Sequence, residues 1–290
     1  MLYLRCRLAC LLVSSLFISP PARAQSFPTG KITTPTGTPV AYTSAGVKGK
    51  PFGTVAAADG TFSLSAFAPA AATDTVVVSC VGYQSRKLLV SQLRQQPAVQ
   101  LYPTATQLQE VMVHSKRPKR TILGHNGSSI FTSLNFYTAK DTVPHDRLGR
   151  EVGLLMKVKQ PVRLESFHLF VFNSDFSFVT FRLTIYAVAN GQPQAPLLQK
   201  DVIFEVAGRK HGWREVDLRP YAIELAGHQD VVASVQWLQS KNDQPTSKYF
   251  GIAAHLSPFH STFLRDKSQE SWQKMGANTS LYFTALAYPG

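Results

Sequence analysis

The amino-acid sequence predicts an all-β protein built from two consecutive sandwiches. No stretch carries apolar residues at helical spacing over a useful length. Short apolar runs separated by turn residues recur along the chain instead, and several of them alternate apolar with polar residues. Asp59-Gly60 is a hairpin turn, and residues 61–64 form the alternating strand that leaves it. We therefore expect a small β-sandwich followed by a larger, jelly-roll-like β-sandwich.

The first residues predict export. Arg5 and Arg7 precede an apolar run over residues 8–18, and Ala22-Arg23-Ala24 places small residues at a cleavage position. We interpret residues 1–24 as a secretory signal peptide that is cut before Gln25. The run is about half of the ~20 residues that span a bilayer, and no later segment approaches that length. The mature chain is expected in the periplasm or at the outer membrane or cell surface, with no transmembrane segment.

The charge balance favours an anionic partner or a highly soluble surface. The formal net charge is +13, and loss of the three arginines and no acids of the leader would lower it to +10. Nucleic acid is not expected as a partner of an exported chain, whereas anionic lipid, lipopolysaccharide or acidic polysaccharide fits the charge. A basic surface that serves solubility alone is the alternative.

The cysteines allow no disulfide inside the mature chain. Cys6 and Cys10 lie in the leader, which leaves Cys80 alone in an apolar strand. We interpret Cys80 as a small core residue, with a reactive thiol as the alternative.

The first sandwich is predicted over residues 28–113, in the order in which its strands follow one another. Phe62, Leu64, Val76 and Val78 alternate so that one face of each strand is apolar. The expected strands span residues 39–44, 53–57, 61–65, 75–81 and 99–102.

A series of short motifs in this region carries a family resemblance. In chain order they are Gly30-Lys31-Ile32, Thr38-Pro39-Val40-Ala41-Tyr42, Gly53-Thr54, Asp59 to Leu64, Val81-Gly82-Tyr83 and Leu108-Gln109-Glu110-Val111-Met112-Val113. This order resembles the carboxypeptidase regulatory-like domain. The resemblance implies a transthyretin-like or prealbumin-like sandwich of the kind that is frequent in exported Bacteroidetes proteins and TonB-dependent receptors. The roughly 175 residues that remain are too few for a plug and a large barrel at about ten residues per strand, so a transporter role does not follow.

Residues 114–146 are predicted to form a basic and polar linker. Lys116, Arg117, Lys119 and Arg120 place four basic residues within five positions. They are candidate contacts with anionic lipid headgroups, at about 1 kcal/mol each. A solvated hinge is the alternative.

Residues 147–290 are predicted to form the second sandwich. Alternation is clearest over residues 181–186 and 231–237. The stretch from His168 to Phe172 is apolar on both faces, which indicates either a strand covered twice or an aromatic surface. The expected strands span residues 152–158, 164–172, 179–188, 198–206, 213–217, 231–237, 249–254, 262–265 and 281–288.

No catalytic constellation is recognised, and no cofactor or metal is predicted. His211 and Glu215 lack the spacing of a zinc carboxypeptidase, and no nucleophile elbow or phosphate-binding glycine loop occurs. The alternative is a hydrolase that uses dispersed residues of the second sandwich. Those residues are Asp175, Glu215, Asp217 and His255.

A candidate ligand site combines His255, Phe259, His260, Arg265 and Trp272 in and near one loop. Such a set can stack on a sugar ring and hydrogen-bond its hydroxyl groups, with ordinary loop and core roles as the alternative. The expected function is that of a non-enzymatic envelope or cell-surface protein that binds a glycan or an envelope protein. A structural or anionic-membrane-associated periplasmic role is the alternative.

Overall fold

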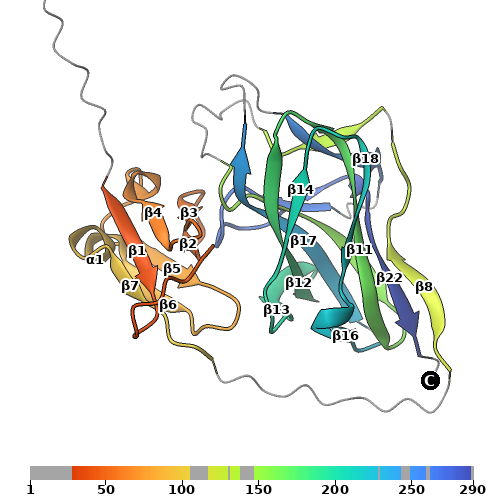
Figure 1. Cartoon of the computed structure of the whole chain (residues 1–290), viewed down its shortest axis with the longest axis horizontal. Helices are drawn as coiled ribbons and strands as arrows, with labels where there is room; N and C mark the ends of the chain where they lie inside the picture. The colour runs from red at the N-terminus through yellow and green to blue at the C-terminus, as the bar shows by residue number, and fades with distance from the viewer. Residues whose placement is uncertain are drawn as a thin grey trace, which may run out of the picture.

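The computed structural model describes residues 28–104, 117–129, 131–137, 147–227, 229–242, 249–258 and 262–288. The expected signal peptide at 1–24 lies outside these residues. The described chain forms two β-sandwiches, a smaller and a larger one, that lie side by side (Figure 1). This confirms the predicted all-β fold class. No helix within the described ranges is long and apolar enough to span a membrane.

The smaller sandwich has two sheets. Strand β1 (Thr29–Thr33) lies at the centre of the first sheet, antiparallel to β4 (Thr61–Ser63) and parallel to β7 (Ala98–Gln100). The helix α1 (Val90–Gln95) and a 3-10 turn over Leu64–Phe67 complete this domain. The first sheet contains β4 (Thr61–Ser63), β1 (Thr29–Thr33) and β7 (Ala98–Gln100), and the second contains β3 (Gly53–Val55), β2 (Ser44–Val47), β5 (Thr75–Ser79) and β6 (Arg86–Leu89).

The alternation around Asp59 positions the core of the smaller sandwich. Gly60 has a φ of 78°, and the Asp59 carboxylate accepts the Thr61 N–H at 2.9 Å, which closes the turn. Phe62 then points inward and meets the Phe67 ring edge-on at 6.3 Å. Burying Phe62 contributes about 1.5 to 3 kcal/mol to the stability of this domain.

One strand of the smaller sandwich begins later than the sequence predicts. Tyr42 adopts a left-handed φ of 52°, and the Thr43 hydroxyl donates to the Val40 carbonyl at 2.9 Å. This local turn interrupts the strand expected over residues 39–44, because a left-handed residue cannot continue a β-ladder. Strand β2 therefore starts only at Ser44.

The larger sandwich packs a seven-stranded sheet on an eight-stranded sheet. Both are antiparallel, and their facing sides enclose a core in which Trp237 contacts Phe181 at 5.4 Å and Phe250 at 5.5 Å between ring centroids. The first sheet contains β13 (Gln192–Pro196), β12 (Phe178–Ala189), β17 (Gln229–Lys241), β10 (Glu151–Val158), β19 (Thr262–Arg265) and β20 (Gln273–Met275), with β14 (Val202–Ala207) beside β12. The second contains β21 (Ala277–Thr279), β18 (Phe250–Leu256), β11 (Val162–Ser174), β22 (Leu281–Ala287) and β8 (Lys119–Gly124), with β15 (Gly212–Asp217) and β16 (Glu224–Leu225) on β11 and β9 (Ser133–Asn135) on β18.

Two of these strands lie inside the stretch 114–146 that the sequence predicts as a linker. Strand β8 pairs with β22, and β9 pairs with β18. The polar composition misleads here because β8 pairs with β22 alone and most of its residues are exposed, while Leu123 enters the core. The larger sandwich therefore includes residues before 147, which corrects the predicted boundary.

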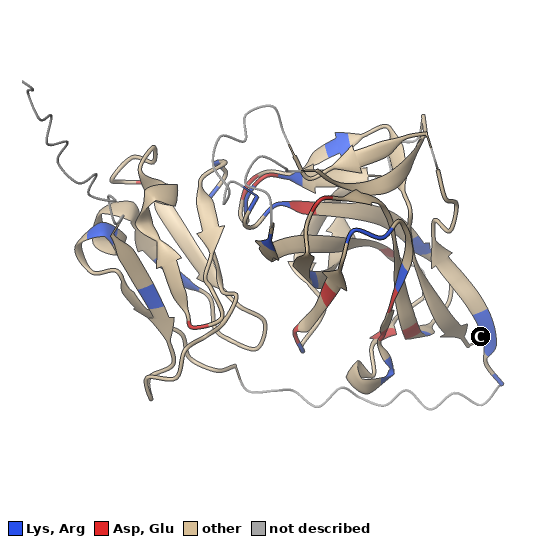
Figure 2. Ribbon diagram, turned by 45° about the horizontal axis from the view of Figure 1, so that its top comes forward, with Lys and Arg blue, Asp and Glu red and all other residues tan. Residues whose placement is uncertain are grey.

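The two sandwiches are in contact. Strands β2 and β3 are buried at every residue, because the first sheet covers one face and the larger sandwich covers the other. A Cβ atom added at Gly46 would lie 1.9 Å from the Ser268 carbonyl oxygen, and the Gly49 N–H donates to the Gln269 carbonyl at 2.9 Å. Acidic and basic positions lie close together on the part of the larger sandwich that faces the smaller one (Figure 2).

Candidate functional site

A row of four polar side chains crosses the seven-stranded sheet on the face turned toward the smaller sandwich. Arg182 on β12 is opposite Gln236 on β17, Gln236 is opposite Glu151 on β10, and Glu151 is opposite Arg265 on β19. Their exposed fractions are only 4, 3, 1 and 9 % respectively. Period-two alternation explains the row, because the neighbouring residues on the same strands, such as Val235 and Val152, point into the core. We call these four residues the polar row.

Glu151 is the hub of the polar row. One carboxylate oxygen accepts hydrogen bonds from Gln236 at 3.0 Å and from Arg265 at 2.7 Å. The other accepts from the Tyr186 hydroxyl at 3.0 Å and the Ser234 hydroxyl at 3.2 Å. Four donors around a carboxylate that is 1 % exposed compensate the cost of burying its charge.

Arg265 lies between two aromatic rings. Its guanidinium carbon is 4.2 Å from the centre of the Trp272 ring and 5.5 Å from the centre of the Tyr186 ring. Burial, followed by the nearby Glu151 charge, raises the pKa of Tyr186, so this hydroxyl stays protonated and acts as a donor. The Arg265 Nε has no hydrogen-bond partner although it is buried. A buried donor without a partner is costly, and because this nitrogen has almost no accessible surface, it is a cost of the site rather than a contact for a ligand.

Arg182 connects the polar row to the smaller sandwich. The Asp201 carboxylate accepts two hydrogen bonds from the Arg182 guanidinium, at 2.6 and 2.7 Å. The guanidinium nitrogen of the second bond also lies 4.0 Å from the Cys80 sulfur in the smaller sandwich. Burial is the largest influence on Cys80 and raises the pKa of its thiol. A protonated, half-buried thiol fits the predicted structural role better than that of a nucleophile.

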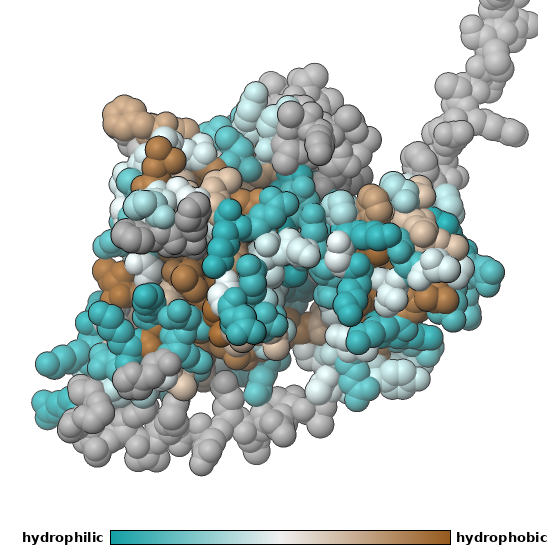
Figure 3. Space-filling view, turned by 180° about the vertical axis from the view of Figure 1, so that it is seen from behind, coloured by the Kyte–Doolittle hydropathy of each residue, from teal (hydrophilic) through white to brown (hydrophobic). Residues whose placement is uncertain are grey.

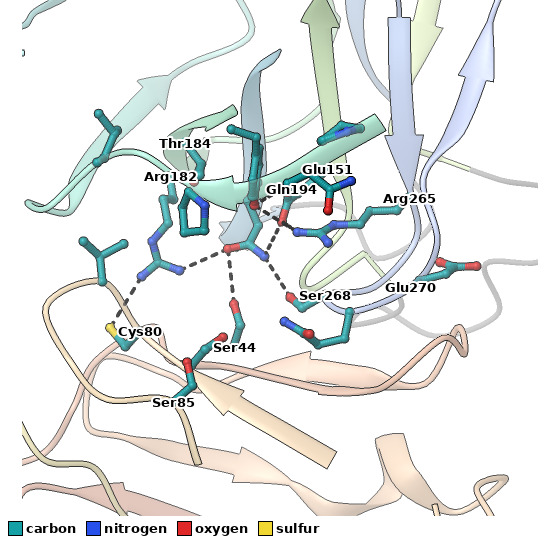
Figure 4. A pocket seen from close by; sticks show the side chains of 18 of the residues that line it. Ser44, Cys80, Ser85, Glu151, Arg182, Thr184, Gln194, Arg265, Ser268 and Glu270 are labelled. Carbon is teal, nitrogen blue, oxygen red and sulfur yellow. Dashed lines mark hydrogen bonds and ion pairs between the residues drawn. The ribbon is translucent and has the colours of Figure 1, made fainter. Parts of the chain in front are cut away.

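The polar row lines a cleft between the two sandwiches with a volume of about 540 Å³ (Figure 4). The charged side chains that line it are two arginines and two glutamates, so their formal charges cancel. The smaller sandwich contributes Ser44, Ser79, Cys80, Val81, Gly82, Tyr83 and Ser85, and the larger one contributes, besides the polar row, Thr184, Tyr186, Pro193, Gln194, Pro196, Leu198, Ser268, Gln269, Glu270 and Trp272.

The structure brings together two of the five residues predicted as a ligand site. Arg265 and Trp272 are in contact and line the cleft. His255 lies in strand β18 of the other sheet rather than in a loop, and its Nδ1 is 3.0 Å from the Nε2 of His125. Phe259 and His260 lie outside the described residues.

The sequence reasoning missed Glu151, Gln236 and Arg182. Each stands in a strand beside strongly apolar neighbours, where an isolated polar residue is easily taken as solvent-facing. One signal was available in the sequence: three strands each carry a polar residue directly beside an apolar one, namely Arg182 before Leu183, Gln236 after Val235 and Glu151 before Val152, which indicates polar residues on one face of a sheet.

The residues of the hydrolase alternative have separate partners in the structure. Strand β15, which carries Glu215 and Asp217, and strand β18, which carries His255, pair with opposite edges of β11. Asp217 forms an ion pair with Arg219 at 2.8 Å, and Asp175 accepts the Tyr249 N–H at 3.0 Å. Among the residues that the structure describes, no three His, Cys, Asp or Glu side chains converge in a way that could hold a metal ion.

The basic residues predicted to contact anionic lipid lie at the start of strand β8. Arg117, Lys119 and Arg120 are exposed, and Lys116 lies outside the described part of the chain. Arg120 is 3.6 Å from the Glu165 carboxylate, with 75 % of its side chain exposed. An ion pair this exposed contributes little to stability, so it leaves the Arg120 guanidinium accessible to an anion.

The comparisons with known proteins identify the smaller sandwich. Residues 28–113 match the family model of the CarboxypepD_reg-like domain, which confirms the resemblance read from the sequence. No curated protein matches the chain. The class that fold and comparison define is thus an all-β chain with a carboxypeptidase regulatory-like domain at its front.

Two solved structures show a distant likeness. The cysteine protease and lectin-like domains of Cwp84, a surface layer associated protein of Clostridium difficile, align with a TM-score of 0.35 and 10 % identity over 48 % of this chain and 32 % of that one. A clostridial cysteine protease Cwp84 after propeptide cleavage aligns with a TM-score of 0.40 and 9 % identity over 58 % of this chain and 40 % of that one. The chain thus spans less than half of either structure, and a likeness at this level supports no functional conclusion.

Proposed function

We propose that the chain is an exported, non-enzymatic binding protein whose interdomain cleft takes a neutral, hydroxyl-rich ligand, either a free glycan or the sugar of an envelope partner. The observation that carries this proposal is the pairing of Arg265 with Trp272 inside the cleft. The Arg265 guanidinium packs on one face of the half-buried indole ring and holds it in place, and the ring lines the cleft as a surface on which a sugar can stack. Polar side chains of the same lining, among them Gln194 and Gln269, can bond the hydroxyl groups of that sugar.

The size and the position of the cleft support a small ligand. Its volume of about 540 Å³ falls within the roughly 300–1,000 Å³ of ligand pockets, and such pockets form preferentially between domains. Gln194, Gln269 and Ser85 add groups that can exchange hydrogen bonds with hydroxyls. The cancelled charges of the lining favour a neutral ligand over an anionic one.

The state of the chemical groups argues against catalysis in this cleft. A general base needs a carboxylate that can reach a substrate proton, whereas both oxygens of Glu151 are occupied by donors of the protein itself, and one oxygen of Glu270 accepts two backbone N–H groups. A cysteine attacks as the thiolate, which a lowered pKa favours, whereas burial raises the pKa of the Cys80 thiol. Binding without turnover is the function that these two observations favour.

A glycan array followed by calorimetry tests the proposal. The Trp272→Ala variant should bind the sugar that occupies the cleft about two- to tenfold more weakly, because ring stacking is worth roughly 0.5–1.5 kcal/mol beyond the buried area. Gln273→Ala, at an exposed neighbouring position, is the matched control and should bind as the original chain does. A folded protein that binds no glycan, or a Trp272→Ala variant that binds every glycan of the array as the original chain does, would overturn the assignment of the cleft.

A second candidate function rests on the exposed Arg117, Lys119 and Arg120. Their charges lie together at the start of β8, close to the end of β22 (Figure 2). Attraction to an anionic membrane would add about 1 kcal/mol per basic residue and would fall with salt. Sedimentation with anionic and with neutral lipid vesicles separates this function from the first, since replacing these three residues with glutamine should release the protein only from anionic vesicles.

A further inference from the structure

The outward face of the eight-stranded sheet carries a connected group of rings. His168 and Phe170 alternate along β11, Trp213 lies opposite Phe170 on β15, and Tyr282 lies opposite His168 on β22. His211 precedes β15 and completes the group. We call these five residues the aromatic strip.

Ring contacts hold the aromatic strip in one arrangement. His168 stacks on Tyr282 with a centroid distance of 4.3 Å and an interplanar angle of 6°. Trp213 meets Tyr282 edge-on at 4.9 Å and Phe170 edge-on at 5.1 Å, and His211 meets Phe170 at 4.9 Å. Rings at these distances and angles support one another, so their positions are fixed before any ligand arrives.

The aromatic strip is not part of the hydrophobic core. The residues that alternate with it, Phe167, Leu169 and Phe283, are fully buried in the core on the other side of the sheet. Trp213, His168 and Tyr282 are half-buried and belong to no core cluster. A solvent-side face of an antiparallel sheet normally carries polar residues, so five connected rings there call for a functional reason.

Hydrogen-bonding groups accompany the rings. The His168 Nε2 lies 2.8 Å from the Ser166 hydroxyl and 3.1 Å from the Thr284 hydroxyl. The exposed Glu215 stands opposite His168 on β15. Four of the five rings also carry a polar atom of their own. Flat rings bordered by hydroxyl, imidazole and carboxylate groups match the alternating faces and hydroxyl edges of a sugar chain.

We infer that the aromatic strip is a second binding site, for the pyranose rings of a polysaccharide chain. It lies on the opposite sheet from the cleft and shares no residue with it, so it stands or falls independently of the proposed function. The strip covers three neighbouring strands, about 10 Å at roughly 4.8 Å per strand, which is enough to seat a short run of sugar rings. A flat protein interface fits less well, because four of the five rings carry a polar atom, and of the two hydrocarbon rings on this face Phe170 is 6 % exposed and Phe172, which meets His211 at 6.2 Å, is half-buried. Seen from behind, the larger lobe shows its hydrophobic side chains in separate patches among hydrophilic ones, rather than in one broad surface (Figure 3).

Co-sedimentation with insoluble cellulose, chitin and peptidoglycan, together with gel retardation in soluble xylan and β-glucan, tests the inference. The full chain should be retained by at least one of these polysaccharides. Trp213→Ala should weaken retention at least about tenfold, and Tyr282→Phe, which keeps the ring, should retain more binding than Tyr282→Ala. Circular dichroism and thermal unfolding show that each variant is folded.

Two control variants keep the outcome clear. Phe131→Ala removes an apolar ring that is 87 % exposed, and it should leave retention unchanged if binding is specific. Trp272→Ala in the cleft should also leave retention by the strip unchanged, which separates failure of this site from failure of the cleft. The inference is overturned if none of the polysaccharides retains the folded chain, or if Trp213→Ala is retained as strongly as the original chain. It is also overturned if Trp213→Ala loses binding to a protein partner but keeps its binding to every polysaccharide.

Discussion

The two outward faces of the larger sandwich follow the same alternation rule and carry opposite chemistry. On the seven-stranded sheet, the outward positions hold the polar row, which the smaller sandwich covers. On the eight-stranded sheet, the outward positions hold the aromatic strip, whose contacts run within its own sheet. The covered face is polar and the other face is aromatic. Burial alone would favour the opposite distribution, with apolar residues on the covered face and polar residues on the other.

This difference shows how each face is held in place. Buried charges must be compensated by donors in fixed positions, so the polar row constrains the geometry of four strands and of the domain contact at once. Rings tolerate partial exposure and need only their neighbours. Substitutions in the polar row are therefore expected to lower the free energy of unfolding strongly. Substitutions in the aromatic strip are expected to weaken binding more than they lower stability.

Removing the hub of the polar row should have the largest effect. Glu151→Ala would leave the buried Arg265 guanidinium without its counter-charge, and breaking such a pair costs about 3–5 kcal/mol. Urea unfolding measures the loss. Glu215→Ala on the aromatic face is the control and should change the free energy of unfolding by less than about 0.5 kcal/mol. Similar losses in the two variants would contradict the contrast between the faces.

Two neighbours on β22 compare the inward side with the outward side directly. Phe283→Ala empties a fully buried core position and should cost about 3–5 kcal/mol. Tyr282→Ala, one residue away on the opposite face, should cost less than half as much, because its ring is only partly desolvated. Thermal or chemical unfolding of the two variants decides the matter, and equal costs would mean that the aromatic strip is a second core.

The contact between the sandwiches can be weakened at one atom. Gly46→Ala would place a methyl group against the Ser268 carbonyl oxygen of the other domain, a clash expected to cost about 1–3 kcal/mol. Small-angle scattering should show a larger radius of gyration, with both domains still folded. Ser44→Ala, which removes only the 3.3 Å bond to Gln236, should keep the compact shape. An unchanged scattering curve for Gly46→Ala would show that the contact adapts.

The smallest expected effect is a dependence of stability on pH. Burial, followed by the neighbouring His255, lowers the pKa of His125 below its usual 6.5. The unfolded chain then binds more protons than the folded one near pH 6, so this part of the stability is complete above about pH 6.5 and is lost as the pH falls through the folded pKa. His125→Gln should flatten the curve of melting temperature between pH 5 and 8. A curve identical to that of the original chain would exclude this pair as the cause.

Alternation in the sequence predicted the fold class and most strands of the larger sandwich, because in a half-buried strand every second residue faces the core and is apolar. It failed for β8, whose residues are mostly solvent-exposed, and at Tyr42, where a single left-handed residue ends the pairing. Of the residues that line the cleft, the sequence analysis predicted only Arg265 and Trp272 as ligand contacts. Its other members come from strands far apart in the chain, and their register decides that Gln236 meets Glu151.

The position of Cys80 gives the cleft a built-in reporter. It is the only cysteine after residue 10, and its sulfur faces the larger sandwich at 4.0 Å from Arg182. The thiol is half-buried and lines the cleft, so the rate at which a thiol reagent modifies it depends on how accessible the cleft is. A ligand that bridges the two sandwiches should slow that labelling in proportion to its occupancy, which gives a way to titrate binding without knowing in advance what the ligand is.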